Sequence, residues 1–500
     1  MMKRKYLSLI LAVATILGTC LSGCGEEQKE TQKADTVEAN ESEQKESNSE
    51  TEEKQETVTI KWYRRTAKVN EDERKVEEAI NEYIEPLIGV KVDVCTNQET
   101  KLDLSLAAGE DIDVFWVANW SNGPGLIASN CAYDITDVVT QYEGLYNSIP
   151  ENIWEAAKID GANYYIPIYK EAASGCSLSV PTAMVEKYGW DLSTVKSLED
   201  ITPFLADVYA DGIDHPMSGK DWEYKATYGL KDFAFVDAFG GIALNGDTTK
   251  IVNIVESEEY AEYIELWYEW NQAGYVNQDE ASTDHTFTTL LEGNDGAFAV
   301  WVNTPDGQAN CSLRYGIDMT LIPLTDNYIT SDSPFGSAYM INQKTEKIDA
   351  VMKFMELLAT DETLANLAAY GIEGEHYELT AEGRVKLIAD SGYTSAGVWA
   401  VCSALAPTLQ EGESADKKEQ YIAFNESAKT SLLAGFNFDK TDVSAEEAAL
   451  NAVYNEYNQL LEEGFYDPEE FLPQYQKALK DAGIDAYLAE MQKQYDAWIQ

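Results

Sequence analysis

Two hydrophobic periods alternate along the first part of the chain that is expected to fold. Residues 58–63 alternate apolar and polar side chains with the period of a β-strand, and apolar residues over 76–87 recur at the spacing of one helix face. Two more strands are predicted at 90–95 and 113–117, with a helix at 99–108 between them. Since strands that alternate with helices form parallel sheets covered by helices, this order predicts an α/β lobe.

A second α/β pattern follows in the rest of the chain. Its predicted elements are helices at 197–210, 257–272 and 348–358 and strands at 297–302 and 337–341. Asn70 with Glu73, and Ser444 with Glu447, have the spacing of helix capping boxes. The C-terminal region 436–500 is predicted to be helical, in segments punctuated by Pro468, Pro473 and Gly483. The predicted fold class is therefore α/β with a helical C-terminal extension.

The N-terminus has the pattern of a secretory signal. A basic start precedes an apolar run at 7–17 that is too short to span a bilayer, and Leu-Ser-Gly-Cys follows, ending at Cys24. This motif resembles the lipobox of bacterial lipoproteins, which implies cleavage of residues 1–23 and acylation of Cys24. The alternative is an ordinary cleavable signal with an incidental cysteine. Residues 24–57 are acidic and polar, which predicts a disordered tether, and the whole arrangement is typical of lipoproteins on the extracellular face of a Gram-positive cell membrane.

Composition narrows the class of protein. The 500 residues include 88 Asp and Glu but 36 Lys and Arg, which gives a net charge of −52. Such acidity repels phosphate backbones and anionic lipid headgroups, so we expect no nucleic-acid partner. The three histidines and the five cysteines that follow Cys24 lack the spacing of metal ligands, so we expect neither a metal nor another cofactor. The scattered cysteines predict no disulfide framework, although one pair stays open.

Catalytic motifs do not stand out in the sequence. We find no Gly-x-Ser-x-Gly elbow, no His-Glu-x-x-His pair, no glycine-rich phosphate loop and no catalytic Cys/His arrangement. A carboxylate pair at glycosidase spacing carries no information here, because acidic residues are so numerous. We therefore expect a binding protein and not an enzyme, with a secreted carbohydrate-active enzyme or a surface adhesin as the alternatives.

Three stretches share motifs with one protein family. They are Thr59–Tyr63 followed by Gly109–Val114, Tyr370–Tyr377 (YGIEGEHY), and Phe436–Ile499. In this order, over residues 58–500, the chain resembles family 1 extracellular solute-binding proteins, the sugar receptors of ABC importers, and a lipoprotein subgroup among them. The resemblance implies a two-lobe periplasmic-binding-protein-like fold of type II that closes on its ligand and delivers it to membrane permease subunits. We expect a monomer.

The order of elements gives approximate lobe boundaries. Lobe 1 is expected to comprise residues 58–168 and 337–376, and lobe 2 residues 169–336 and 377–500. The chain is expected to cross between the lobes near 165–170, near 333–337 and after Tyr377. The motif that ends at Tyr377 is then expected to act as a hinge or as a contact between the lobes.

Eleven tryptophans and thirty tyrosines give the chain a large supply of flat aromatic rings. A sugar presents an apolar ring face and a belt of hydroxyls, so its receptor needs such rings together with hydrogen-bonding side chains. Both kinds of residue occur in predicted loops after strands, where ligands of α/β sheets bind. The candidate ligand-binding residues are Tyr63, Arg64, Trp116, Asn119, Trp120, Glu171, Trp222, Trp301 and Trp399.

Several of these candidates have a structural alternative. Arg64 or Arg65 could contact ligand hydroxyls or a uronate carboxylate, but a structural ion pair is slightly favoured. Trp116, Trp120 and Trp301 lie in or near predicted loops after strands. This position favours a role in ligand contact over a role in packing. We expect a neutral or uronate-bearing oligosaccharide as ligand, and a peptide or another small solute is the alternative.

Overall fold

The structure of the protein is a computed structural model. It describes residues 57–66, 68–97, 102–121, 123–218, 224, 228–277, 291 and 296–500. The predicted signal, 1–23, and all but the last residue of the predicted tether, 24–57, lie outside this part of the chain. Residues 55–500 form one compact unit. Within the described residues, no helix has the length and apolar character that crossing a membrane requires.

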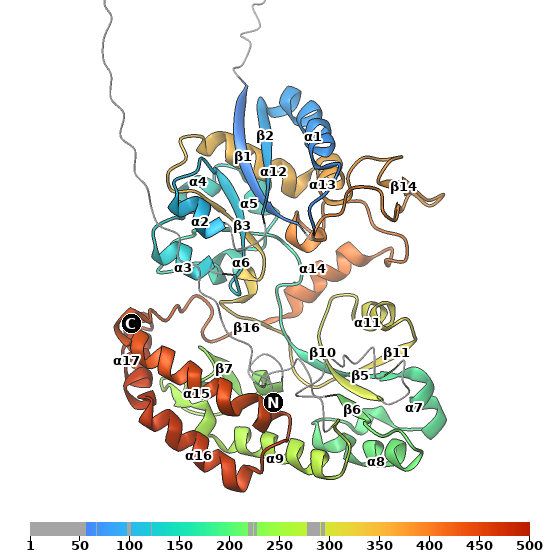
Figure 1. Cartoon of the computed structure of the whole chain (residues 1–500), viewed down its shortest axis with the longest axis vertical. Helices are drawn as coiled ribbons and strands as arrows, with labels where there is room; N and C mark the ends of the chain where they lie inside the picture. Colours follow the sequence, from blue (N-terminus) through green and yellow to red (C-terminus); the bar gives the residue numbers. More distant parts are fainter. Residues whose placement is uncertain are drawn as a thin grey trace, which may run out of the picture. The chain divides into compact units, whose positions relative to one another are not determined.

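A five-stranded mixed sheet forms the centre of the first lobe (Figure 1). In spatial order its strands are β2 (Val90–Asn97), β1 (Val58–Arg65), β3 (Val114–Val117), β13 (Ala338–Ile341) and β4 (Ile166–Pro167). β1 runs parallel to β2 and to β3, as predicted, whereas β13 is antiparallel to β3 and β4. β13 reaches the sheet from the second lobe, so no crossover helix fixes it as a parallel strand.

Alternate strand residues are buried on the two faces of this sheet. Ile60, Trp62 and Trp116 belong to a core shared with α1 (Glu73–Ile88), α12 (Ile348–Thr360) and α13 (Glu362–Tyr370). Phe115 and Val117 belong to a core shared with α2 (Leu102–Ala107) and α3 (Gly123–Ala128). The remaining helices of this part are α4 (Thr136–Val139), α5 (Glu143–Asn147) and α6 (Glu151–Ala156). Successive side chains of a strand point to opposite faces, which explains why its alternating pattern predicted β1.

The capping box predicted at Asn70 is wrong. α1 begins at Glu73 with Asp72 as its N-cap, and no side chain caps it. Asn70 instead donates through Nδ2 to Glu73 Oε2 at 2.8 Å and to the carbonyl of Thr394 at 3.1 Å. The side chains with capping spacing are therefore used to hold a distant loop.

Residues 377–406 pack with the first lobe and not with the second. This segment contains β14 (Tyr377–Leu379), β15 (Val385–Leu387) and the 3-10 helix η9 (Val398–Ala400). Its buried side chains share a core with α1 and α12; they are Tyr377, Val385, Tyr393, Ala400, Val401, Cys402 and Ala406. The lobe boundary predicted after Tyr377 is therefore wrong, because these apolar side chains complete the core over α13.

The motif at 370–377 joins two helices of the first lobe. His376 is buried, its Nδ1 accepts the N–H of Ile372 at 2.9 Å, and its Nε2 lies 3.2 Å from Asp72 Oδ2. The motif thus ties the end of α13 to the start of α1, and the expected hinge role is wrong for it.

Two sheets build the second lobe. The larger has the order β11 (Met319–Pro323), β5 (Cys176–Pro181), β10 (Phe298–Val302) and β6 (Met217–Ser218), and the smaller the order β7 (Phe233–Phe235), β8 (Gly240–Ala243) and β9 (Val252–Asn253). The helices are α7 (Thr182–Tyr188), α8 (Thr202–Ala210), α9 (Glu258–Gln272) and α11 (Gly307–Tyr315). The 3-10 turn Glu199–Ile201 precedes α8, so the helix predicted at 197–210 is interrupted near its start.

Three passages of chain connect the lobes. They run from β4 to β5, from β11 to β13, and from η9 through α14 (Lys417–Ser427) and β16 (Lys429–Thr430). β12 (Tyr328–Ile329), in the second passage, pairs in parallel with β16 in the third. Figure 1 shows α14 and β16 between the two lobes.

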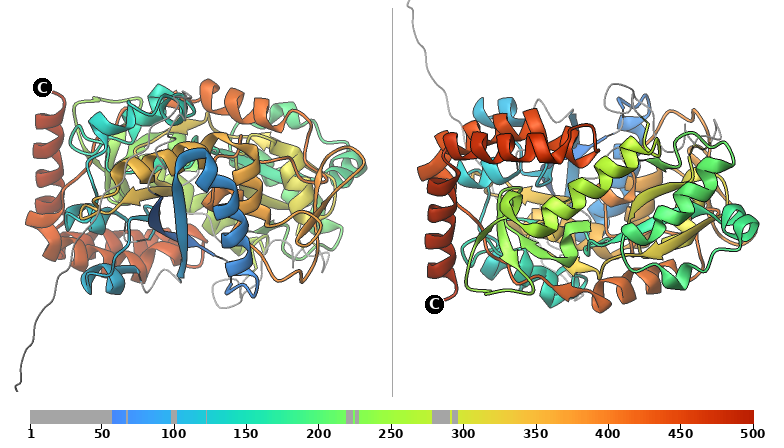
Figure 2. Two further views of the ribbon diagram at one scale, coloured as in Figure 1. Left: turned by 90° about the horizontal axis from the view of Figure 1, so that it is seen from above. Right: turned by 90° about the horizontal axis from the view of Figure 1, so that it is seen from below.

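The C-terminal region is helical, as predicted. It contains α15 (Ser444–Glu462), α16 (Pro468–Asp481) and α17 (Ile484–Trp498), which bury side chains in the core of the second lobe. Ser444 is the first residue of α15 and not its cap, so the second predicted capping box is wrong as well. Pro473 lies inside α16 and does not end it. Figure 2 (right) shows α17 along one end of the second lobe, beside the strands β7 and β8.

Candidate functional site

An arginine and three tryptophans meet at the carboxyl ends of β1 and β3. The guanidinium carbon of Arg65 lies 4.9 Å from the ring centre of Trp116, 4.7 Å from that of Trp120 and 4.9 Å from that of Trp399. Trp116 also lies 5.5 Å from Trp120 and 6.2 Å from Trp399, ring centre to ring centre. A cation held over aromatic rings is favourable, so the four side chains support one another. We call these four residues the tryptophan cluster.

Three separate segments supply this cluster. Arg65 ends β1, Trp116 lies in β3 with Trp120 in the turn after it, and Trp399 lies in η9. The carboxyl ends of neighbouring parallel strands meet at one edge of a sheet, which is where ligands of such folds bind. Three of the predicted site residues are therefore brought together in space.

Within the cluster, Trp120 alone is largely open to solvent. Trp116 is 5% exposed, its Nε1 donates to Ser337 Oγ at 2.8 Å, and its ring packs on Trp120 and Trp399, so its prediction as a ligand contact is wrong. Trp120 is 54% exposed, although its Nε1 donates to the carbonyl of Gly336 at 3.3 Å. Trp120 is thus held at its polar edge while its ring remains accessible, which suits stacking on the apolar face of a sugar.

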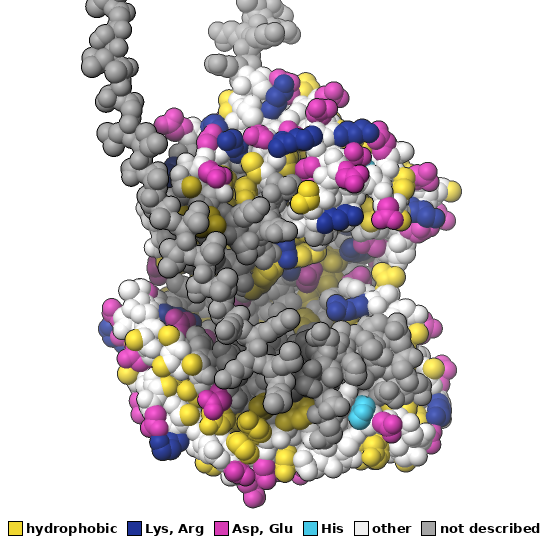
Figure 3. All heavy atoms as spheres, in the orientation of Figure 1, with side chains coloured by type: hydrophobic (Ala, Val, Ile, Leu, Met, Phe, Trp, Pro, Cys, Tyr) yellow, Lys and Arg dark blue, Asp and Glu magenta, His cyan; other side chains and the backbone are white. Residues whose placement is uncertain are grey.

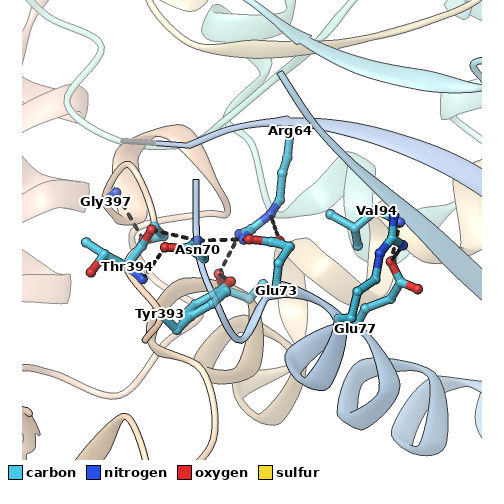
Figure 4. Close-up of polar contacts among 11 residues, drawn as sticks. Arg64, Asn70, Glu73, Glu77, Val94, Tyr393, Thr394 and Gly397 are labelled. Carbon is cyan, nitrogen blue, oxygen red and sulfur yellow. Dashed lines mark hydrogen bonds and ion pairs between the residues drawn. The ribbon is translucent and has the colours of Figure 1, made fainter. Parts of the chain in front are cut away.

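The prediction that Arg64 contacts a ligand is wrong. Its side chain is 2% exposed and donates from Nε and Nη2 to Glu73 Oε1, at 3.1 and 2.6 Å (Figure 4). Nη1 donates to the carbonyl of Ala368, which also accepts the hydroxyl of Tyr393. A buried charge needs such partners, so Arg64 is a structural residue that joins β1, α1 and α13.

This polar network also fixes the loop that leads to Trp399. Asn70 and Thr394 form a reciprocal pair, because Thr394 N–H donates to Asn70 Oδ1 at 2.9 Å and the amide nitrogen of Asn70 donates to the carbonyl of Thr394 (Figure 4). Further along the loop, Gly397 N–H donates to Ser395 Oγ at 3.1 Å. Gly397 has φ +105°, a conformation that favours glycine. The tryptophan cluster therefore rests on a loop held by hydrogen bonds.

A cavity of about 530 Å³ lies between the lobes beside this cluster. Asn119, next to Trp120 in sequence, lines it from the first lobe, and β7 lines it from the second. Its volume is within the range of small-molecule sites. In Figure 3 the surface is hollowed between the two lobes.

The walls of this cavity differ in chemistry. One is apolar and is formed by Leu230, Phe233, Ala234, Phe235, Val236 and Leu244. The other is polar and is formed by Asn119, Ser174, Thr330, Asp332, Lys429, Thr430 and Ser431. Asn119 Oδ1 is buried and has no hydrogen-bond partner within the described structure. An unpaired buried acceptor is costly, so Asn119 Oδ1 is a candidate acceptor for a donor group that enters this lining.

A second cavity, of about 410 Å³, lies on the other side of Lys429. It is more polar, and its lining includes Ser177, Asn303, Thr304, Asp326 and Asn327. Asn303 accepts the hydroxyl of Ser177 at 2.5 Å and donates to Asn327 Oδ1 at 2.7 Å. These hydrogen bonds pair Ser177, Asn303 and Asn327, whereas Thr304 Oγ1 is buried and has no partner within the described residues.

The lysines near the cavities are each paired with a carboxylate. Lys429 pairs with Asp326, Lys170 with Glu171 at 2.9 Å, and Lys417 with Glu413. Burial, followed by the negative charges of Glu171, Asp306 and Glu413, raises the pKa of Tyr421 well above its ordinary value. Each of these three lysines therefore already has an anionic partner.

The remaining predicted site residues lie elsewhere or play other roles. Trp301 is 5% exposed and packs with Cys311 and Met319 between β10 and α11, so its prediction as a ligand contact is wrong. Tyr63 is half-buried beside the core under α2, and burial raises its pKa. Glu171 pairs with its neighbour Lys170. Trp222 lies outside the described residues.

Most residues that line the cavity carry no recognisable signal in the sequence. In the sequence, the residues of β7 have the pattern of an ordinary short strand. Lys429 and Asp332 have the pattern of ordinary surface charges. Arg65 was considered only as an alternative to Arg64, although it is the arginine in the tryptophan cluster. The strand period is a signal that separates these neighbours, because Arg64 shares the buried face of β1 with Ile60 and Trp62, whereas Arg65 does not.

Within the described chain, one group of side chains has the composition of a metal site. It comprises Asp72, Glu375 and His376. Because Nδ1 of His376 accepts the N–H of Ile372, its proton lies on Nε2, which faces Asp72. Nε2 therefore has no lone pair for a cation, and the group is better explained as a structural contact.

Comparisons with known proteins agree with this architecture. Residues 78–372 match the family model described as bacterial extracellular solute-binding protein, and residues 432–500 match a domain of unknown function, DUF3502. A carbohydrate ABC transporter substrate-binding protein of Streptococcus pneumoniae is 26% identical over 439 residues, which cover 84% of this chain and 87% of that protein.

Solved structures have the same fold. The crystal structure of the N-glycan transport solute binding protein NgtS of Streptococcus pneumoniae is 23% identical, with a TM-score of 0.78 over 88% of this chain and 99% of that one. The same protein in complex with Man5GlcNAc gives a TM-score of 0.65 at 24% identity, over 88% of this chain and 98% of that one. The family match covers more than half of the chain, and the two lobes are those that the family implies. The chain belongs to the bacterial extracellular solute-binding protein family.

Proposed function

We propose that this protein is the substrate-binding component of an ABC importer and captures a carbohydrate between its lobes. The observation that carries the proposal is the exposed ring of Trp120 beside a cavity with one apolar and one polar wall. Two similar proteins support the same class of ligand. One is the carbohydrate ABC transporter substrate-binding protein, and the other is NgtS, whose structures include glycan complexes.

The two walls match the two surfaces of a sugar. The apolar wall at β7 suits the ring C–H face, and the opposite wall offers hydroxyls, an amide, a carboxylate and an ammonium group to ligand hydroxyls. Asn119 adds an acceptor that has no other partner in the described chain. The cavity can hold about one or two sugar residues in addition to one stacked on Trp120.

The charges favour a neutral sugar over the uronate that the paired arginines suggested. Arg64 is committed to Glu73, and Arg65 lies over three tryptophan rings. Lys429, Lys170 and Lys417 each have a carboxylate partner. An added uronate would therefore compete with these carboxylates for the lysines, and it would also meet the unfavourable long-range field of a chain with a net charge of −52.

Capture proceeds by closure and leaves the sugar chemically unchanged. A ligand that contacts Asn119 on one lobe and β7 on the other binds the closed form more tightly, so it shifts the population toward closure. The closed monomer then delivers its ligand to the permease subunits in the membrane. The difference in ligand affinity between the open and closed forms drives the closure of the lobes.

Calorimetric titration against a panel of glycans tests this proposal. The panel contains Man1GlcNAc, Man5GlcNAc, maltose, maltohexaose, sucrose and nystose, with alginate oligosaccharides as the anionic set and a peptide mixture as the rival class. We expect at least one neutral glycan to bind with about micromolar affinity, near −8 kcal/mol, and to be recovered unchanged. Binding of peptides but of no saccharide, or hydrolysis of the glycan, would overturn the proposal.

The protein is further proposed to be a lipoprotein on the extracellular face of the cell membrane, anchored through Cys24. The lipobox-like motif and the acidic segment 24–57 support this anchor. Incorporation of labelled palmitate should be lost in Cys24→Ser and retained in Cys20→Ser, which changes a matched cysteine inside the predicted signal. Equal labelling of both variants would contradict the anchor.

A further inference from the structure

A segment that matches the family model of a domain of unknown function packs against the hairpin that lines the cavity. This C-terminal module, residues 432–500, meets the turn between β7 and β8. Tyr487 donates its hydroxyl to Asp237 Oδ2 at 2.7 Å. Asp237 Oδ1 accepts the N–H groups of Phe239 and Gly240, which closes the turn. One carboxylate therefore links the module to the shape of the hairpin.

Side chains of the module also enclose the turn. The ring of Phe239 lies 5.9 Å from that of Tyr454 and 6.0 Å from that of Tyr487, edge to face in both cases. A Cβ at Gly240 would lie 2.5 Å from Sδ of Met491, so the backbone of the turn touches α17 directly. Such close packing transmits the position of α17 to the hairpin.

The same hairpin forms the apolar wall of the cavity through Phe233, Phe235 and Val236. The start of the module contributes Leu432 to the cavity. Ser331 holds this start in place, because its Oγ donates to the carbonyl of Leu433 at 2.7 Å and accepts the N–H of Gly435 at 2.9 Å. The module thus acts on the cavity both directly, through Leu432, and through the hairpin.

We propose that the C-terminal module is a specificity element of the ligand site. It holds two parts of the cavity lining, the β7–β8 hairpin and Leu432, so that a long neutral glycan gains contacts beyond the sugar residue at Trp120. Tyr487 is a positioning residue in this scheme, because it acts through Asp237 and does not touch the ligand. The inference rests on the proposed function and deepens it by assigning recognition of glycan length to residues 432–500.

The test compares two tyrosines of α17 in the full-length protein. Tyr487→Phe removes the hydroxyl bonded to Asp237, and Tyr495→Phe removes a hydroxyl that donates to the carbonyl of Thr248, away from the cavity, at 2.8 Å. Dissociation constants are measured with three pairs of short and long neutral glycans: Man1GlcNAc with Man5GlcNAc, maltose with maltohexaose, and sucrose with nystose. Melting temperatures report the general loss of stability in each variant.

We expect Tyr487→Phe to weaken binding of the long glycan about fivefold, the value of one lost hydrogen bond, and to leave the short glycan within about twofold. Tyr495→Phe should lower the melting temperature similarly and change neither affinity. Leu432→Ala, which truncates a lining side chain, should also affect only the long glycan. Equal effects of Tyr487→Phe and Tyr495→Phe would overturn this inference alone. If none of the six glycans binds the wild type, the inference falls together with the proposed carbohydrate function.

Discussion

Trp120 and Trp301 occupy comparable places in the two lobes but have opposite surroundings. Each belongs to the end of a strand or to the turn just after it, and sequence analysis treated both as ligand contacts. Trp120 is 54% exposed beside the cavity, whereas Trp301 is 5% exposed beneath α11. The difference teaches that a position after a strand makes a residue available only if no helix covers that end of the sheet.

Trp301→Ala should have the largest effect, and the effect should be on stability. We expect the free energy of unfolding to fall by about 4 kcal/mol, because removal of a buried indole leaves a cavity beside Cys311 and Met319. Chemical denaturation measures this change, and calorimetry should show unchanged glycan affinity. A weaker affinity with normal stability would instead place Trp301 in the site and remove the contrast between the lobes.

Arg64→Met should lower the free energy of unfolding by about 3 kcal/mol, because it leaves the partly buried carboxylate of Glu73 without its cation. The double variant Arg64→Met/Glu73→Gln removes both charges and should recover part of that loss. Denaturant unfolding of the wild type and the three variants, including Glu73→Gln alone, gives the coupling between the two side chains. A single variant with normal stability but lost affinity would restore Arg64 as a ligand contact.

Trp120→Ala should weaken glycan binding by about 2 kcal/mol, the value of one lost stacking contact. Its ring is exposed, so the melting temperature should change little. Trp498→Ala is the matched control, since Trp498 is 44% exposed but ends α17 and does not belong to the tryptophan cluster. Titration calorimetry that finds the same affinity for Trp120→Ala and the wild type would show that the tryptophan cluster is not the binding surface.

Asn119→Ala should have the smallest effect, about 1 kcal/mol of binding free energy, because it removes one hydrogen-bond acceptor. Asn163→Ala is the control, because Asn163 Oδ1 is also buried without a partner in the described chain but lies outside the cavity lining. Only the first substitution should change the dissociation constant. Equal affinities of both variants would argue against a direct contact at Asn119.

Sequence analysis anticipated much of the fold because local patterns determine local structure. The alternating residues of β1 and the amphipathic α1 form as predicted, since one face of each must be buried. The lobe to which residues 377–406 belong could not be predicted, because the sequence of short strands and loops does not indicate which core their side chains complete. The capping spacing of Asn70 and Glu73 failed for a similar reason, because Thr394, far away in sequence, offered a competing partner.

For the candidate site, residue type was predictable and environment was not. Tryptophans suited to a sugar are visible in the sequence, and three of them do meet in one cluster. Arg64 and Arg65 are identical neighbours in sequence, yet one is buried against Glu73 and the other lies over Trp120. The polar wall of the cavity depends on β16 lying beside β12, which are some hundred positions apart in the chain and paired through Tyr328 and Lys429.

The amino-acid sequence by itself determined the elements and the supply of aromatic rings, because these follow from periodicity and composition, and its family motifs implied the two-lobe class. Only the tertiary structure decided which rings remain open to a ligand, which arginine is neutralised and which helices support the cavity. The physical reason is that burial and pairing are properties of neighbours in space. Those neighbours come from segments whose separation along the chain leaves no local trace.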